Sequence, residues 1–118
     1  MKRDWELVRK ILTALESKSS TQDILNPKEV EGYNEETVSY HIQLLIEAGL
    51  IEGTCSKVLN APLHCVAYRL TWGGHEFIDE IRTDTVWNKV KRILTDKGIE
   101  LSFESIKIAV KAVISDVF

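Results

Sequence analysis

The chain has 118 residues, of which 44% are hydrophobic and 28% are charged, and its formal net charge is −3. That length suits one domain with one core, since domains typically run to about 100–150 residues. No apolar run approaches the roughly 20 residues that span a bilayer, and no apolar signal-peptide core follows the first residues. We therefore expect a cytoplasmic protein that does not associate with membranes.

The charge is distributed unevenly along the chain. Residues 20–54 hold one basic and seven acidic side chains, a net charge of −6, whereas residues 1–19 sum to +2. Affinity for duplex DNA comes largely from Lys and Arg side chains that neutralise phosphates. The acidic segment is therefore poorly suited to bind DNA by charge alone.

The first predicted helix covers residues 4–17, where Asp4 can cap the helix and apolar residues recur at helical spacing. These apolar residues are Trp5, Val8, Ile11, Leu12 and Leu15. The segment that follows holds Pro27 and Gly32, which leave no room for a long helix. The alternation over residues 29–31 favours a short strand instead. The supporting helix of a helix-turn-helix is therefore expected to be lost or reduced.

Residues 34–48 are predicted to form a second helix, which ends at a glycine and turns directly into a strand. Asn34 can cap this helix, and its apolar residues Val38, Ile42 and Leu45 share one face. Gly49 is placed to take the left-handed conformation that ends a helix. This order is the one in which the recognition helix of a winged helix-turn-helix runs into its wing.

Two strand-like segments, residues 50–58 and 65–70, follow and are joined by turn residues near Asn60. They would form the wing. A third helix is expected over residues 71–81, with Gly73 and Gly74 allowing close backbone packing at its start.

Two further helices are expected over residues 85–97 and from Phe103 to the end, with Gly98 ending the first and Ser102 capping the second. The fold class is therefore α+β. We expect residues 1–82 to form a winged-helix core and residues 83–118 a helical extension.

The apolar residues of the last helix spread over more than one face, with Ile108 and Ala112 beyond the main stripe. A stripe this wide on a terminal helix favours a homodimer through that helix. The alternative is that the helix packs over the first helix of the same chain.

Five segments together resemble one known family. They are Met1-Lys2-Arg3-Asp4, Glu31-Gly32-Tyr33, Tyr40-His41-Ile42-Gln43-Leu44-Leu45, Arg69-Leu70-Thr71-Trp72-Gly73-Gly74-His75-Glu76-Phe77 and Asp84-Thr85-Val86-Trp87. The family is domain of unknown function 2513, which is found in bacteria, often in prophage regions. The resemblance spans nearly the whole chain and implies a winged-helix fold, but it implies no activity. The pattern of a helix followed by Ala-Gly-Leu-Ile also resembles bacterial regulators of the arsenic-repressor and multiple-antibiotic-resistance types.

A recognition helix in a major groove would turn the side opposite Val38 and Ile42 toward the bases. The candidate contacts, with one basic residue from the wing, are Glu36, Ser39, Tyr40, Gln43, Glu47 and Lys57. No Lys or Arg lies between residues 29 and 56. Two hypotheses follow. The first is a DNA-binding transcriptional regulator, and the second is a winged-helix adaptor that binds a protein through its acidic face.

A second basic patch is predicted on the helix over residues 85–97, where it could bind nucleic acid or an acidic partner. Its members are Lys89, Lys91, Arg92 and Lys97. A solvated helix face is the simpler interpretation, since such charge runs are common on exposed helices.

The cysteines and histidines suggest zinc, but the spacing of Cys55, His64, Cys65 and His75 contains no CxxC or HxxxH pair. No metal and no cofactor are therefore expected. Cys55 and Cys65 would lie opposite each other in the hairpin, so a redox-active disulfide is conceivable. Structural thiols are favoured, because cytosolic thiols are normally reduced.

The remaining residues of interest are interpreted as structural. His41 is expected to be satisfied between helices, and Trp5, Trp72 and Trp87 are expected to anchor the core. The sequence has no phosphate-cradling glycine loop, no nucleophile elbow and no HExxH motif. A non-enzymatic protein is therefore expected.

Overall fold

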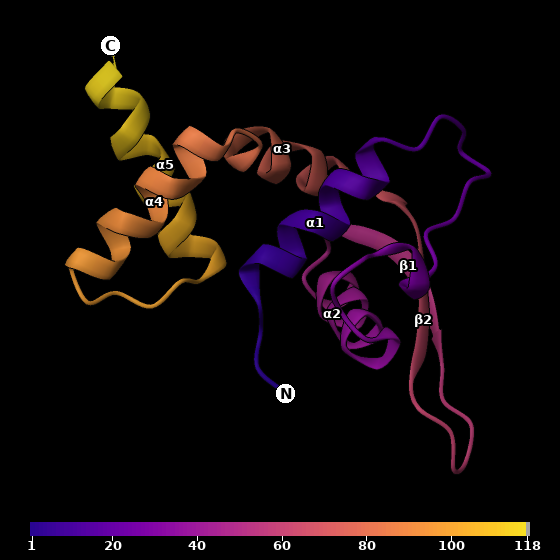
Figure 1. The fold of residues 1–118 in the computed structure, drawn as a ribbon. Coiled ribbons are helices and arrows are strands. Elements are labelled where there is room, and N and C mark those ends of the chain that lie inside the picture. Colours follow the sequence, from indigo (N-terminus) through magenta and orange to yellow (C-terminus); the bar gives the residue numbers. More distant parts are fainter. Residues whose placement is uncertain (118) are drawn as a thin grey trace. The chain divides into compact units, whose positions relative to one another are not determined.

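A computed structural model describes the backbone of residues 1–117 and the side chains of residues 1–114. The described elements are α-helices, one short 3-10 helix and an antiparallel pair of strands (Figure 1). In chain order they are α1 (Trp5–Glu16), η1 (Pro27–Glu29), α2 (Glu35–Glu47), β1 (Ile51–Ser56), β2 (His64–Leu70), α3 (Trp72–Ile81), α4 (Asp84–Asp96) and α5 (Phe103–Val117). The expected α+β class is confirmed.

The chain divides into two compact units, Met1–Glu76 and Phe77–Phe118, and the boundary falls inside α3. The first unit contains α1, η1, α2 and the hairpin. The second contains the rest of α3, α4 and α5. The functional division expected at residue 82 stays a prediction.

Helix α1 begins where the sequence predicts. The Asp4 carboxylate accepts hydrogen bonds from the backbone N–H groups of Glu6 and Leu7, at 3.0 and 3.3 Å, and so caps the helix. Its buried stripe is Leu7, Val8, Ile11, Leu12 and Leu15. Leu7 thus takes the inward place that the sequence analysis gave to Trp5, which is only half-buried.

The strand expected over residues 29–31 is wrong. Pro27 fixes φ and has no N–H, so it starts the 3-10 turn η1 instead. The strand-like pairing occurs earlier, at Leu25, whose N–H and carbonyl both bond to Ala67 of β2 at 2.8 and 3.1 Å. The segment between α1 and α2 thus holds a single 3-10 turn in place of a longer helix.

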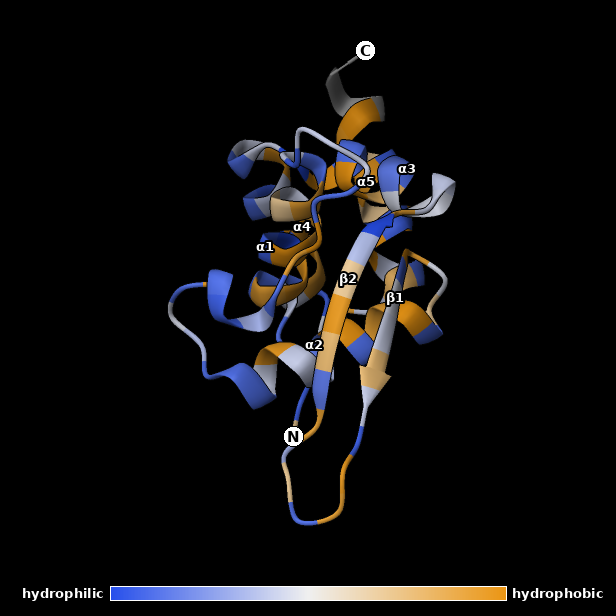
Figure 2. Cartoon of the chain, turned by 90° about the vertical axis from the view of Figure 1, so that its right-hand side faces the viewer, coloured by the Kyte–Doolittle hydropathy of each residue, from blue (hydrophilic) through white to orange (hydrophobic). Residues whose placement is uncertain are grey.

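Helix α2 and the hairpin follow the predicted order. Asn34 caps α2 by accepting the N–H of Thr37 at 2.8 Å, and Gly49 ends it with φ +77°. The hairpin pairs Ile51 with Leu70 and Cys55 with Cys65. Both β1 and β2 contact α2, and the hairpin loop projects beyond the end of that helix (Figures 1 and 2). This order is compatible with a winged helix.

In the second unit, α4 packs against α5. Thr83 caps α4 through the N–H of Val86, and Gly98 ends it with φ +67°. The Phe77 ring stacks on Phe103 at 4.5 Å between centroids. The buried residues of α4 and α5 are Trp87, Val90, Leu94, Ile106, Ala109, Val110 and Val113. None of the helices in the described part of the chain is both long and apolar enough to cross a membrane.

The start of α3 lies very close to Leu50, the residue directly before β1. A Cβ atom on Gly74 would collide with the backbone carbonyl oxygen of Leu50. The same carbonyl accepts the N–H of Thr71 at 2.9 Å, so moving it away would strain or break that hydrogen bond. Gly73 is different, since a Cβ there would meet only the Thr71 hydroxyl, at 3.8 Å. Close backbone packing is therefore confirmed for Gly74 alone.

Gly74→Ala is expected to lower the free energy of unfolding by about 1–3 kcal/mol, because backbone must shift to admit the methyl group. Gly73→Ala is the matched control on the same helix. It should not lower the free energy of unfolding, since Ala favours helix over Gly. Denaturant unfolding followed by circular dichroism measures both. Equal stability of the two variants would contradict the close approach.

Candidate interaction face

One side of α2 is left open by the packing of the first unit. Glu36, Tyr40, Gln43 and Glu47 follow one another at intervals of four, three and four residues, so they share that side. Glu36 and Glu47 are exposed, and Tyr40 and Gln43 are half-buried. We name these four residues the α2 face. It brings together four of the five α2 residues that the sequence analysis proposed as DNA contacts.

The fifth, Ser39, was predicted wrongly. Ser39 is fully buried, and its hydroxyl accepts the backbone N–H of Cys65 in β2 at 3.0 Å. It lies three residues before Ile42 and therefore on the buried side of the helix. A strand N–H that needs an acceptor inside the protein accounts for a polar residue there. The spacing to Ile42 was the signal that could have revealed this.

His41 is satisfied between helices, as expected. Its ring is fully buried, with Nε2 accepting the backbone N–H of Asp4 at 2.8 Å and Nδ1 lying 2.9 Å from the Thr37 carbonyl. A backbone N–H can only donate, so the proton sits on Nδ1 and is donated to that carbonyl. Because Asp4 also caps α1, His41 joins the start of α1 to α2.

Two cations of the first unit are paired with carboxylates outside α2. Arg69 makes two hydrogen bonds to the carboxylate of Glu52, both at 2.8 Å. Lys18 pairs with Glu29 at 2.7 Å. Helix α2 itself contains no Lys or Arg. The charge of the α2 face is therefore set by its own carboxylates.

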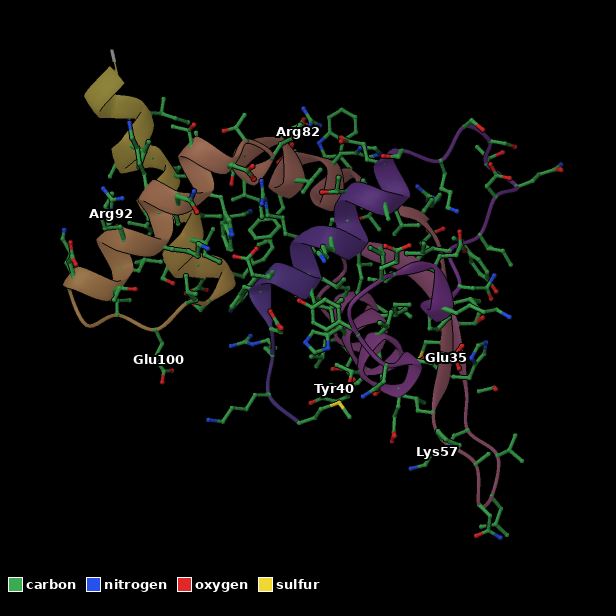
Figure 3. All side chains as sticks on the ribbon, in the orientation of Figure 1. Glu35, Tyr40, Lys57, Arg82, Arg92 and Glu100 are labelled. Atoms are coloured by element: carbon green, nitrogen blue, oxygen red, sulfur yellow. A yellow bond between two sulfur atoms is a disulfide. The ribbon has the colours of Figure 1, made fainter. Side chains whose placement is uncertain are left out.

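Lys57 is exposed on the hairpin just beyond β1, toward the loop (Figure 3). The loop residues that follow are apolar and exposed, with Val58 at 64% and Leu59 at 88% exposure, and Figure 2 shows this hydrophobic stretch at the far end of the hairpin. The loop end of the hairpin thus offers the cation Lys57 beside exposed apolar residues.

Two ionisable groups of the first unit have pKa values shifted from their ordinary ones. The N–H of Asn26 and the ammonium of Lys18 hold the pKa of Glu29 below its ordinary value. Burial, followed by the carboxylate of Asp4, raises the pKa of Tyr33. Neither group belongs to the α2 face.

The expectation of separate structural thiols is wrong. Cys55 and Cys65 face each other across the hairpin and form a disulfide with an S–S distance of 1.99 Å. Cys65 is buried, whereas Cys55 is exposed. The paired register of two neighbouring strands brings the sulfurs together, as the hairpin turn near Asn60 suggested. Over the described residues, no group of three His, Cys, Asp or Glu side chains is arranged to hold a metal ion.

The expectation for Trp72 is also wrong. Its side chain is 80% exposed, and Nε1 donates to the Glu76 carboxylate at 2.6 Å. The inward stripe of α3 runs through Gly74, Phe77, Ile78 and Ile81, and Trp72 lies two residues before that stripe, on the opposite side. Trp87 is buried, as expected.

The second basic patch stands in the second unit. Lys89, Arg92 and Lys97 are exposed, and Figure 3 shows Arg92 on α4. Lys91 differs, since it is half-buried with its ammonium 5.5 Å from the centre of the Trp87 ring. Lys91 therefore has different surroundings from the three exposed side chains, and the basic patch stays a prediction.

On α5 the exposed apolar residues are Ile108, Ala112 and Ile114, with Ile108 at 69% exposure. Ile108 and Ala112 lie apart from the buried stripe, as the sequence suggested. Val117 and Phe118, which the sequence places on the same helix, lie outside the described side chains. The homodimer through α5 stays a prediction.

The family described as hypothetical protein (DUF2513) matches residues 2–100. The chain belongs to that family. A relative from Haemophilus influenzae, named "Uncharacterized protein", is 46% identical over 115 residues, which cover 98% of this chain and 97% of the relative. No solved structure matches the chain. The resemblance identified from the sequence is thus confirmed.

Replacing Ser39 by Ala removes the acceptor of a buried strand N–H. We expect the free energy of unfolding to fall by about 1–3 kcal/mol, the cost of leaving such a group unsatisfied. Ser56→Ala, at an exposed position of β1, is the control and should change stability by no more than about 0.5 kcal/mol. Chemical denaturation measures both. An Ser39→Ala protein as stable as the parent would show that the Cys65 N–H is satisfied in another way.

Reducing the disulfide should lower the free energy of unfolding by about 2–3 kcal/mol, because the bond closes a loop with a sequence separation of 10. The Ser39 bond to the strand does not use the sulfurs, so the helical content should remain. Denaturation with and without a thiol reductant measures the change, and a Cys55→Ala/Cys65→Ala protein should not respond to the reductant. Two free thiols in the untreated protein, counted by mass spectrometry after alkylation, would contradict the bond.

Proposed function

We propose that this protein is a non-enzymatic winged-helix regulatory module that binds a basic protein partner through the α2 face. The order α1, η1, α2, β1, β2 supports the winged-helix assignment, with α2 in the place of the recognition helix. The observation that carries the proposal is the chemistry of α2. Its open side holds carboxylates and no cation.

Electrostatics disfavour a DNA-reading role for this helix. In a major groove, the sides of a recognition helix run close to two phosphate backbones. Glu35, Glu36 and Glu47 are all exposed on α2 and would meet those phosphates well within the Debye length of about 10 Å. Binding of this kind gains its affinity from cations, which α2 lacks.

The same residues suit a protein partner. The Tyr40 ring is half-buried and combines apolar area with a hydroxyl, a combination enriched at protein interfaces. The Gln43 amide can donate and accept. Glu36 and Glu47 flank these two residues and would attract and orient a basic surface.

DNA binding remains a second candidate function because of the hairpin. The hairpin loop projects beyond α2, as a wing does, and carries the exposed cation Lys57 (Figures 1 and 3). The weakness of this candidate is that a single wing cation would have to offset the carboxylates of α2.

The proposal is tested with a fluorescent peptide of alternating Lys and Gly as a basic probe. At about 50 mM salt the parent protein should bind it, and Glu36→Lys/Glu47→Lys should weaken binding at least about tenfold, because two attractions become repulsions. A matched control with the same net charge is Glu100→Lys/Glu104→Lys, at exposed sites of the second unit (Figure 3 labels Glu100). An equal loss of affinity in both variants would show that net charge alone determines binding and would overturn the proposal.

A further inference from the structure

A cavity lies between the first turn of α2 and the loop of the hairpin. Its volume is about 400 Å³, and its lining residues are Asn34, Glu35, Glu36, Pro62, Leu63 and His64. We name it the hairpin groove. All of its lining belongs to the first unit. Figure 3 shows Glu35 on the side of α2 next to the hairpin.

The two walls of the groove differ in chemistry. The helix wall presents the carboxylates of Glu35 and Glu36, both exposed. The hairpin wall presents the Pro62 ring and the half-buried side chain of Leu63. The carboxylates of the helix wall would repel an anionic ligand. A purely apolar ligand would remove water from these carboxylates without offering them a hydrogen-bond donor. The groove therefore favours a ligand with an apolar part and a cationic end.

Both walls are held in place by bonds within the first unit. Asn34 caps α2 through the N–H of Thr37, which fixes the first turn. The residue after His64 is Cys65, which is anchored twice: its N–H bonds to Ser39, and its sulfur bonds to Cys55. The groove is thus built before any partner arrives, which lowers the entropic cost of binding.

We propose that the hairpin groove receives an arginine side chain of the basic partner, an inference that rests on the proposed function. Arginine has an apolar stem and a charged head that often pack in different surroundings. Pro62 and Leu63 would pack the stem. The guanidinium would donate to the carboxylates of Glu35 and Glu36, for which its planar fork is better suited than an ammonium.

The size of the groove agrees with this occupant. Sites for small ligands measure about 300–1,000 Å³, so a single side chain with its adjoining backbone fits at the lower end. The groove opens at one end of α2, and the α2 face continues from Glu36 along the helix. An arginine anchored in the groove would place the rest of a basic segment along Tyr40, Gln43 and Glu47.

The test is an NMR titration of the ¹⁵N-labelled full chain with acetyl-Gly-Arg-Gly-amide, at about 50 mM salt, where exposed charge pairs are weakly screened. Saturable shifts should appear for the amides of residues 34–37 and 63–65. The same peptide with citrulline, which has the shape of arginine without its charge, should produce none. The lysine peptide should bind more weakly than the arginine peptide.

Variants separate the two walls. Glu35→Gln/Glu36→Gln should lower the affinity for the arginine peptide roughly tenfold, because two charge-assisted hydrogen bonds are lost. Leu63→Ala should weaken it about threefold through lost apolar contact. Leu59→Ala is the matched control, since Leu59 is exposed in the same loop and does not line the groove. It should leave the affinity unchanged, and a loss equal to that of Leu63→Ala would overturn the role of the apolar wall.

The positions of the shifts distinguish binding in the hairpin groove from binding on the α2 face. Amide shifts centred on Gln43 and Glu47, with affinity lost on Glu47→Gln, would overturn the assignment of arginine to the hairpin groove. The α2 face would remain as the site for a basic partner. Absence of binding by both the arginine peptide and the Lys-Gly probe would overturn both.

Discussion

The outer edge of β2 must have its backbone groups satisfied, and two neighbouring segments do this. Ala67 pairs with Leu25, and the N–H of Cys65 bonds to the buried hydroxyl of Ser39 in α2. An open strand edge is a liability, so closing it matters for the whole unit. The Ser39 bond also fixes which side of α2 faces the sheet. His41 also holds the rotation of α2, because its buried ring accepts the N–H of Asp4 at the start of α1.

Once the inner side of α2 is fixed, its outer side follows from helical geometry. That side holds Glu36 and Glu47 around Tyr40 and Gln43, and no rotation of the helix could exchange them for cations, because α2 has none. The exposed side of α2 thus carries the opposite charge from the one that phosphates require. A basic protein surface is the partner that we propose for this side. The hairpin groove beside it adds the carboxylate of Glu35 and an apolar wall.

Much of the fold could be predicted from the sequence, because its signals are local. Asp4 and Asn34 cap helices, and Gly49 and Gly98 end them with positive φ, as residue type alone suggests. What could not be predicted depends on partners distant in the chain. Ser39 lies inward because a strand 26 residues away needs an acceptor, and the Cys55–Cys65 bond depends on the hairpin register. At the candidate site the carboxylates were identified correctly as exposed, whereas the groove required the loop and the helix to be placed together.

The most direct measurement is fluorescence anisotropy of labelled genomic duplex DNA titrated with the purified protein at about 50 mM and about 200 mM salt, a range over which phosphate contacts lose most of their affinity. An acidic α2 face that serves a protein partner predicts no DNA binding at either concentration. Binding at low salt that weakens at high salt, persists for particular fragments and disappears on Lys57→Ala would contradict that assignment and show that the wing and α2 read DNA.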